Sequence, residues 1–351
     1  MHPETHPFLP ARNLILLIGD GMGIGHLSAA LAATGGSLHM ARCVDLGLMQ
    51  THAADTFITD SAAAATALAT GHKTRNGVVG LDARLLPHPN IREWLACRGW
   101  ATGVLACCPV TEATPAAFVA HHPLRTEHEA IARAFVDAEL HFFGGEGRRF
   151  FTQRSDGLHL ADDLRAAGYA LAEDRAAIGG LYGHDRVAVL LDEMPRYAEG
   201  RDDLLGTLLH LALHTLQRQS DGFFLVVEGS QIDWAAHCND ADYLLEELLD
   251  FDRVVGQALD FAAQNGETLV VVTADHETGS VSVPGGDLAR GSVEVAFATT
   301  LHTADLVPVL AQGPGAHLFR GIYDNTRLFH HMLAAMGVGT PAGEAVGELL
   351  L

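Results

Sequence analysis

Lysine is almost absent from this 351-residue sequence: Lys73 is the only one, and the other basic residues are arginines. Positive charge is scarce altogether, because 43 Asp and Glu residues outnumber 22 Lys and Arg residues and give a formal net charge of −21. Nucleic acids and anionic membrane surfaces would repel such a chain at long range. We therefore expect neither of them as its main partner.

Cysteine and long apolar runs are also rare. An odd number of cysteines with no C-x-x-C pair indicates neither a disulfide framework nor a zinc ribbon. The longest apolar runs, such as residues 14–18 and 223–227, are far shorter than the roughly 18 residues of a membrane-spanning helix. Residues 1–12 lack the apolar region of a secretory signal, so we expect that such a signal is either absent or already removed from this sequence. The five cysteines are Cys43, Cys97, Cys107, Cys108 and Cys238.

Short apolar segments alternate with helical patterns along the chain. Strands are predicted at residues 13–18, 101–106, 186–191, 222–227, 268–273 and 307–311. Helices are predicted at residues 25–34, 61–70, 127–138, 158–167, 202–217 and 240–264. This alternation predicts an α/β fold with a doubly wound, largely parallel sheet and helices on both faces. We expect a short N-terminal segment, residues 1–12, and a single domain over residues 13–351.

A glycine-rich turn, Ile18-Gly-Asp-Gly-Met-Gly-Ile-Gly25, follows the first predicted strand. Its spacing is not G-x-G-x-x-G, so it is weak evidence for a dinucleotide site. The carboxylate of Asp20 would also repel a pyrophosphate. Asp20 is therefore a candidate metal ligand, although aspartate is common in ordinary turns as well.

Further carboxylates and histidines follow other predicted strands, at the sheet edge where open α/β sheets bind ligands. Asp233 and His237 are four residues apart and would share one face of a helix. Carboxylates together with imidazoles suit Zn²⁺, while carboxylates and hydroxyls alone suit Mg²⁺. The candidates in these positions are Glu228, Asp233, His237, Asp275, His276 and His302.

Ser61 begins a run of small residues, Ser61-Ala-Ala-Ala-Ala-Thr66, that predicts a helix. Serine often caps helix N-termini, so a purely structural role is one interpretation. The alternative is a nucleophile whose developing negative charge faces free backbone N–H groups at the positive end of the helix dipole. This segment alone does not decide between the two.

Taken together and in order, these motifs resemble the metal-dependent alkaline phosphatase family from about residue 13 to residue 329. The segments that carry the resemblance are Ile18-Gly-Asp-Gly-Met-Gly23, Thr59-Asp-Ser-Ala-Ala-Ala-Ala-Thr66, Val227-Glu-Gly-Ser-Gln-Ile-Asp233, Thr273-Ala-Asp-His-Glu-Thr-Gly279 and Tyr323-Asp-Asn-Thr-Arg-Leu-Phe329. The resemblance implies hydrolysis of small phosphate monoesters with two zinc ions and one magnesium ion per chain. The implied ligands are Asp233, His237 and His302 for the first zinc, and Asp20, Asp275 and His276 with the Ser61 oxygen for the second.

The resemblance also implies the remaining parts of the site. Asp20, Thr114 and Glu228 would bind the magnesium. Arg125 would grip two phosphoryl oxygens with its planar guanidinium, which lysine could not reproduce. Ser61 would form a phosphoserine intermediate, and two successive displacements would give net retention of configuration at phosphorus.

This chain departs from the family pattern in three places. Trp234 follows the first zinc aspartate, where other members have lysine or histidine. Glu112 stands where some members have aspartate in the outer shell of the magnesium. Only 22 residues separate Gly279 from His302, where typical members insert a further subdomain that they use in dimerisation. We therefore expect either a monomer or a homodimer.

Two other functions remain open. A relative with the same fold and metals would hydrolyse phosphodiesters, phosphonates or sulfate esters instead. A non-catalytic phosphate or nucleotide binder would need only the glycine-rich turn. The family is mostly exported, which favours a periplasmic or secreted location, although no signal peptide is present in this chain.

Overall fold

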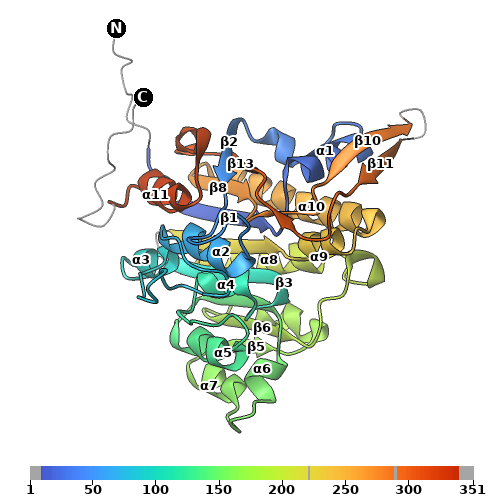
Figure 1. Cartoon of the computed structure of the whole chain (residues 1–351). Helices are drawn as coiled ribbons and strands as arrows, with labels where there is room; N and C mark the ends of the chain where they lie inside the picture. The colour runs from blue at the N-terminus through green and yellow to red at the C-terminus, as the bar shows by residue number, and fades with distance from the viewer. Residues whose placement is uncertain (1–8, 220–221, 288–290, 340–351) are drawn as a thin grey trace.

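A computed structural model describes residues 9–219, 222–287 and 291–339 (Figure 1). Ten strands form one sheet in the order β14-β2-β13-β8-β1-β7-β3-β4-β6-β5. Strand β13 runs antiparallel to both of its neighbours, and the other pairings in this sheet are parallel. In the order of the sheet, the strands are β14 (Gly321–Asp324), β2 (Asp45–Gln50), β13 (Val307–Gln312), β8 (Thr268–Thr273), β1 (Asn13–Gly19), β7 (Phe223–Gly229), β3 (Ala101–Pro109), β4 (Phe142–Glu146), β6 (Val187–Leu191) and β5 (Ala170–Ala172).

Helices cover the central strands. Every residue of β1, β3, β7 and β8 is buried, so both faces of these strands are covered. Helix α10 packs on β8 and β1, while α8, α3 and α4 contact β3. The helices are α1 (Ile24–Ala33), α2 (Ser61–Thr70), α3 (Ile91–Ala96), α4 (Ala113–Ala117), α5 (His128–Asp137), α6 (Arg149–Thr152), α7 (Leu160–Ala166), α8 (Leu204–Leu216), α9 (Gln231–His237), α10 (Ala241–Asn265) and α11 (Thr326–Ala335).

Two small ladders lie outside the main sheet. One is the hairpin of β10 (Ser282–Asp287) and β11 (Ser292–Ala296), which Figure 1 shows above α10 at the upper right. The other pairs β9 (Glu277–Thr278) with β12 (His302–Thr303) in antiparallel fashion. Both lie in the interval between Gly279 and His302 or at its borders, where a larger subdomain is typical of the family that the sequence resembles.

The α/β prediction is confirmed, and the predicted elements lie within three residues of their observed bounds. Strand β8 and helix α2 match completely. Several short strands were missed, among them β4, whose sequence Phe-Phe-Gly-Gly-Glu has two glycines of low strand propensity. Over the part of the chain that the structure describes, no helix is both long and apolar enough to cross a membrane.

Candidate active site

The carboxyl ends of four neighbouring strands converge at one edge of the sheet. Strand β1 lies between β7 and β8, in parallel with both. Asp20 follows β1, Glu228 is near the end of β7, and Asp275 follows β8, so that three carboxylates from distant parts of the chain meet. Strand β3, on the other side of β7, leads into α4 and places Thr114 at the same edge.

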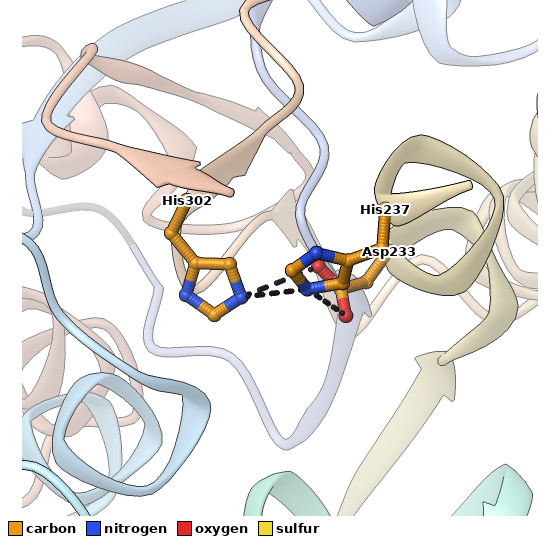
Figure 2. Close-up of side chains that lie close together, drawn as sticks. All are labelled: Asp233, His237 and His302. Atoms are coloured by element: carbon orange, nitrogen blue, oxygen red, sulfur yellow. Dashed lines mark hydrogen bonds and ion pairs between the residues drawn. The ribbon is translucent and has the colours of Figure 1, made fainter. Parts of the chain in front are cut away.

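Asp233, His237 and His302 form what we name the first ligand cluster (Figure 2). His237 Nε2 lies 3.3 Å from Asp233 Oδ2 and 3.1 Å from His302 Nε2. Each imidazole donates its Nδ1 hydrogen to a carbonyl, His237 to Thr300 at 2.6 Å and His302 to Thr59 at 2.9 Å. The two Nε2 atoms and the carboxylate therefore face one another as acceptors, with no hydrogen between them. Either a proton on His237 or a cation shared by all three residues would remove this repulsion.

Asp20, Asp275, His276 and Ser61 form the second ligand cluster. His276 Nε2 lies 3.4 Å from Asp20 Oδ1, 3.2 Å from Asp275 Oδ2 and 3.2 Å from Ser61 Oγ. The two carboxylate oxygens are buried and accept no hydrogen bond. Asp233 borders this cluster too, because its ligand atoms lie within 4.8 Å of those of Asp20 and His276.

Ser61 is the first residue of α2 and is buried beside the second cluster. Its interpretation as a helix cap is wrong. Asp60 is the cap, because its Oδ1 accepts a hydrogen bond from Ala63 N at 2.9 Å. The Ser61 hydroxyl thus takes no part in capping and lies near the positive end of a ten-residue helix, with His276 Nε2 as its neighbour.

The three residues expected at the magnesium, Asp20, Thr114 and Glu228, line a cavity of about 40 Å³ together with Ser61 and Arg125. The Cys108 thiol donates a hydrogen bond to Glu228 Oε2 at 3.4 Å from within the same wall. The cavity is small enough to suit ions and a phosphoryl group, and Asp233 of the first cluster also lines it.

Arg125 enters this cavity from the loop before α5. Its Nη1 donates to Asp60 Oδ2 at 3.0 Å, and its Nη2 lies 3.6 Å from Glu112 Oε2. Glu112, expected near the magnesium, therefore lies against Arg125 as well as lining the cavity. Trp234 also lines the cavity and is 39% exposed, which puts its indole at the mouth of the site.

The site carries excess negative charge. Burial raises the pKa of Asp20 well above its usual value, and the nearby Asp275 raises it further. Burial also raises the pKa of Glu228 to about 7. Burial opposes ionisation of Asp233 too, but the hydrogen bonds from His237 and Thr278 and the nearby imidazoles together outweigh it and lower the pKa of Asp233 to about 2. The same hydrogen bond to Asp233 raises the pKa of His237 to about 8. Buried carboxylates with unpartnered oxygens and facing imidazoles fit divalent cations.

The glycine-rich turn has a steric reason to be rich in glycine. Gly21 has φ 72°, and a Cβ there would lie 2.8 Å from Thr278 Oγ1 and 3.0 Å from Asp233 Oδ1. The turn thus brings its backbone against the ligand clusters, which explains its composition without a dinucleotide.

Two residues of the site were missed from the sequence. Thr278 donates its hydroxyl hydrogen to Asp233 Oδ1 at 2.6 Å and lies 3.2 Å from His276 Nδ1, so it orients a ligand in each cluster. Asp60 holds Arg125 as well as capping α2. Asp60 had a local signal, since Asp-Ser before a run of alanines is typical of a helix start.

The chain is similar in sequence and in structure to several phosphatases. The family model for alkaline phosphatase matches residues 11–293. Alkaline phosphatase 4 of Bacillus subtilis is 30% identical over 90% of this chain and 86% of its own length. Streptomycin-6-phosphate phosphatase of Streptomyces griseus is 34% identical over 94% and 91% of the two chains.

Solved structures show the same likeness. Alkaline phosphatase from the Antarctic bacterium TAB5 superimposes with a TM-score of 0.90 at 35% identity, covering 95% of this chain and 100% of its own. A variant of that enzyme has been solved with Mg bound in its M3 site. This chain therefore belongs to the alkaline phosphatase family and is an enzyme that hydrolyses phosphate monoesters.

Proposed function

We propose that the enzyme hydrolyses small phosphate monoesters through a phosphoserine on Ser61. One observation carries the proposal: Ser61 Oγ lies at the N-terminus of α2 and 3.2 Å from His276 Nε2, inside the cavity that Arg125 enters. The arrangement therefore combines a nucleophile, Ser61, with a helix N-terminus that stabilises negative charge. Arg125 adds a cation that can bind the phosphoryl group.

The two clusters would hold zinc and the adjoining cavity magnesium. The first zinc would take Asp233, His237 and His302, and the second Asp20, Asp275 and His276 beside Ser61. Magnesium would take Asp20, Thr114 and Glu228, with Glu112 in its outer shell and Trp234 near the first zinc. When bound, these ions neutralise the buried carboxylates and act as Lewis acids on oxygen atoms.

The chain's own residues account for the steps of the reaction. Ser61 Oγ attacks phosphorus in line, so that an O–P bond to serine forms as the bond to the alcohol oxygen breaks. The proton that the serine hydroxyl loses balances the proton that the departing alcohol gains. The helix N-terminus of α2 favours the charge of the resulting phosphoserine. Water then attacks phosphorus and Ser61 leaves, releasing phosphate. Two in-line displacements give net retention at phosphorus.

Arg125 selects the dianionic monoester. Asp60 and Glu112 hold its guanidinium from two sides, which fixes the direction of its planar fork. The fork can donate to two free phosphoryl oxygens at once, and a diester would offer it fewer of them.

We further propose that residues 13–351 form one catalytic domain, of which residues 340–351 lie outside the part of the chain that the structure describes. A single sheet takes strands from Asn13 to Asp324, and one continuous apolar core surrounds it, which supports this division.

The test compares Ser61→Ala with Ser28→Ala, an exposed serine on α1, in zinc- and magnesium-loaded enzyme. We expect Ser61→Ala to lower kcat on p-nitrophenyl phosphate about 1,000-fold or more, and Ser28→Ala to leave it unchanged. Acid quenching with labelled substrate should trap phosphoserine in the wild type only. A higher rate on the corresponding diester or sulfate ester would contradict the monoester assignment, and metal-independent binding without turnover would indicate a phosphate binder.

A further inference from the structure

The small ladder of β9 and β12 has one side toward the catalytic site and one side away from it. His302 pairs with Thr278, and Thr303 pairs with Glu277. Side chains alternate between the faces of a strand, so His302 and Thr278 share one side, where both approach Asp233. Glu277 and Thr303 share the other side, which no step of the proposed mechanism uses.

Glu277 is a buried carboxylate that gathers three hydrogen bonds. Its residue surface is 3% exposed. Oε1 accepts from Val281 N at 3.1 Å, and Oε2 accepts from Ser280 N at 3.2 Å and from the Thr303 hydroxyl. Two successive backbone N–H groups on one carboxylate form an anion-binding turn. Ser280 has φ 47°, an unfavourable conformation for serine that this contact stabilises.

Glu277 has no Lys or Arg ion-pair partner among the residues that the structure describes. His26 Nδ1 lies 3.8 Å away but accepts from Gly23 N at 3.1 Å, and burial lowers the pKa of His26 to about 3, so this imidazole is neutral. The backbone of Gly23 packs so closely that a Cβ there would lie 2.3 Å from Glu277 Cγ. Hydrogen bonds and packing, rather than a salt bridge, fix the carboxylate.

The turn that Glu277 stabilises is joined to residues 298–303. Gly279 O accepts from Ala298 N at 2.9 Å, and Gly279 N donates to Leu301 O at 3.0 Å. This segment contains His302, and its Thr300 carbonyl accepts the Nδ1 hydrogen of His237. Two of the three side chains in the first ligand cluster are therefore placed by a segment anchored at Glu277.

We propose that Glu277 is a positioning residue that sets how tightly the first ligand cluster holds its cation. The inference rests on the proposed function in one respect, that this cluster binds zinc. Residues that orient metal ligands from behind typically change metal affinity 10- to 100-fold when altered. Glu277→Gln replaces one acceptor oxygen with an NH₂ donor, so that either the bond from Val281 N or the bonds from Ser280 N and Thr303 are lost, according to how the amide is turned.

The experiment measures zinc release from zinc-loaded enzyme to a chromogenic chelator, with the remaining zinc per chain counted over time. We expect Glu277→Gln to release one zinc about 10- to 100-fold faster than wild type and the second at the wild-type rate. Excess zinc should restore its kcat. Glu294→Gln, an exposed glutamate on β11, serves as the matched control and should behave as wild type.

A second pair of variants covers the case in which Glu277→Gln does not fold. Thr303→Val removes only the hydroxyl that donates to Glu277, and Thr303→Ser restores a hydroxyl. We expect selective loss of one zinc in the first and wild-type retention in the second. The inference is overturned if zinc release is unchanged in Glu277→Gln and Thr303→Val, or if both ions leave faster in step with a lower Tm of the metal-free protein. A wild-type enzyme that holds no zinc would instead contradict the proposed function.

Discussion

Two groups of buried carboxylates in this protein differ in what balances their charge. Glu247 and Asp250 on α10 share the guanidinium of Arg201, whose side chain is 1% exposed and lies 2.8 Å from Asp250 Oδ2. Asp20, Glu228, Asp233 and Asp275 gather at the sheet edge. Among the described residues that line the cavity of Asp20, Glu228 and Asp233, Arg125 is the one strongly basic side chain, and it contacts Asp60 and Glu112 instead.

The difference separates a structural group from a functional one. A buried carboxylate needs a partner, because an uncompensated charge in the interior is strongly unfavourable. In the first group the partner is Arg201, a residue of the chain itself. Its ion pairs join the segment before α8 to α10. The group at the sheet edge leaves oxygens of Asp20 and Asp275 unpartnered, which fits cations supplied from outside.

Removing Arg201 should have the largest effect on stability. Arg201→Met leaves the buried Glu247 without its ion-pair partner and Asp250 with only the partly exposed Arg253, and breaking such a buried pair costs about 3–5 kcal/mol. We expect that loss in the free energy of unfolding from urea titration, with kcat per folded molecule and zinc content close to wild type. A loss of zinc without a loss of stability would show that the two groups do not differ as described.

A neutral substitution in the group at the sheet edge should raise, rather than lower, the free energy of unfolding of the metal-free protein. The raised pKa of Glu228, about 7 against 4.5 for an ordinary glutamate, means that the folded state holds a proton that the unfolded chain releases. This term stabilises the metal-free fold fully below about pH 4.5 and is lost as the pH rises through about 7. At pH 8 metal-free wild type therefore holds a buried, ionised carboxylate, which lowers its stability. Glu228→Gln carries no charge there, so the metal-free variant should be more stable than metal-free wild type at pH 8, by roughly 1–3 kcal/mol.

The measurement is urea unfolding of both proteins at pH 5 and pH 8, with and without metals. The advantage of Glu228→Gln should shrink toward pH 5, and added zinc and magnesium should make wild type the more stable protein. If the free energies of unfolding of the two proteins differed equally at both pH values, Glu228 would not be a carboxylate whose burial opposes its ionisation.

The same contrast explains what the sequence could predict. The β1, β7 and β8 patterns are continuous apolar runs that end in carboxylates, so the sheet and the edge where ligands meet follow from local signals. The assignment of each ligand to a particular ion came from the family resemblance, because His237 and His302 are 65 positions apart and no local pattern relates them. The structure places them together; their roles stay proposals.

The Arg201 group had no local signal at all. Its partners lie 46 and 49 positions away, and an arginine in a polar stretch before a helix is indistinguishable from a surface residue. Glu277 likewise has no signal of its own within the motif Thr273-Ala-Asp-His-Glu-Thr-Gly279. Its contacts with Thr303 and Gly23 depend on how β12 and the glycine-rich turn fold back on it. Charge balance in the interior is a tertiary property, which composition and spacing do not reveal.

The smallest expected effect is that of Arg125→Lys, which distinguishes Arg125 from the structural Arg201. Arg125 is 30% exposed at its side chain and is held by surface-accessible carboxylates, so Arg125→Lys should leave the Tm unchanged. Lysine keeps the charge but cannot donate to two phosphoryl oxygens in a planar fork, so KM for p-nitrophenyl phosphate and the inhibition constant for phosphate should both rise about tenfold. Steady-state kinetics and thermal unfolding of the same preparations check both parts. An unchanged KM would place phosphate binding elsewhere, and a lowered Tm would make Arg125 a structural residue like Arg201.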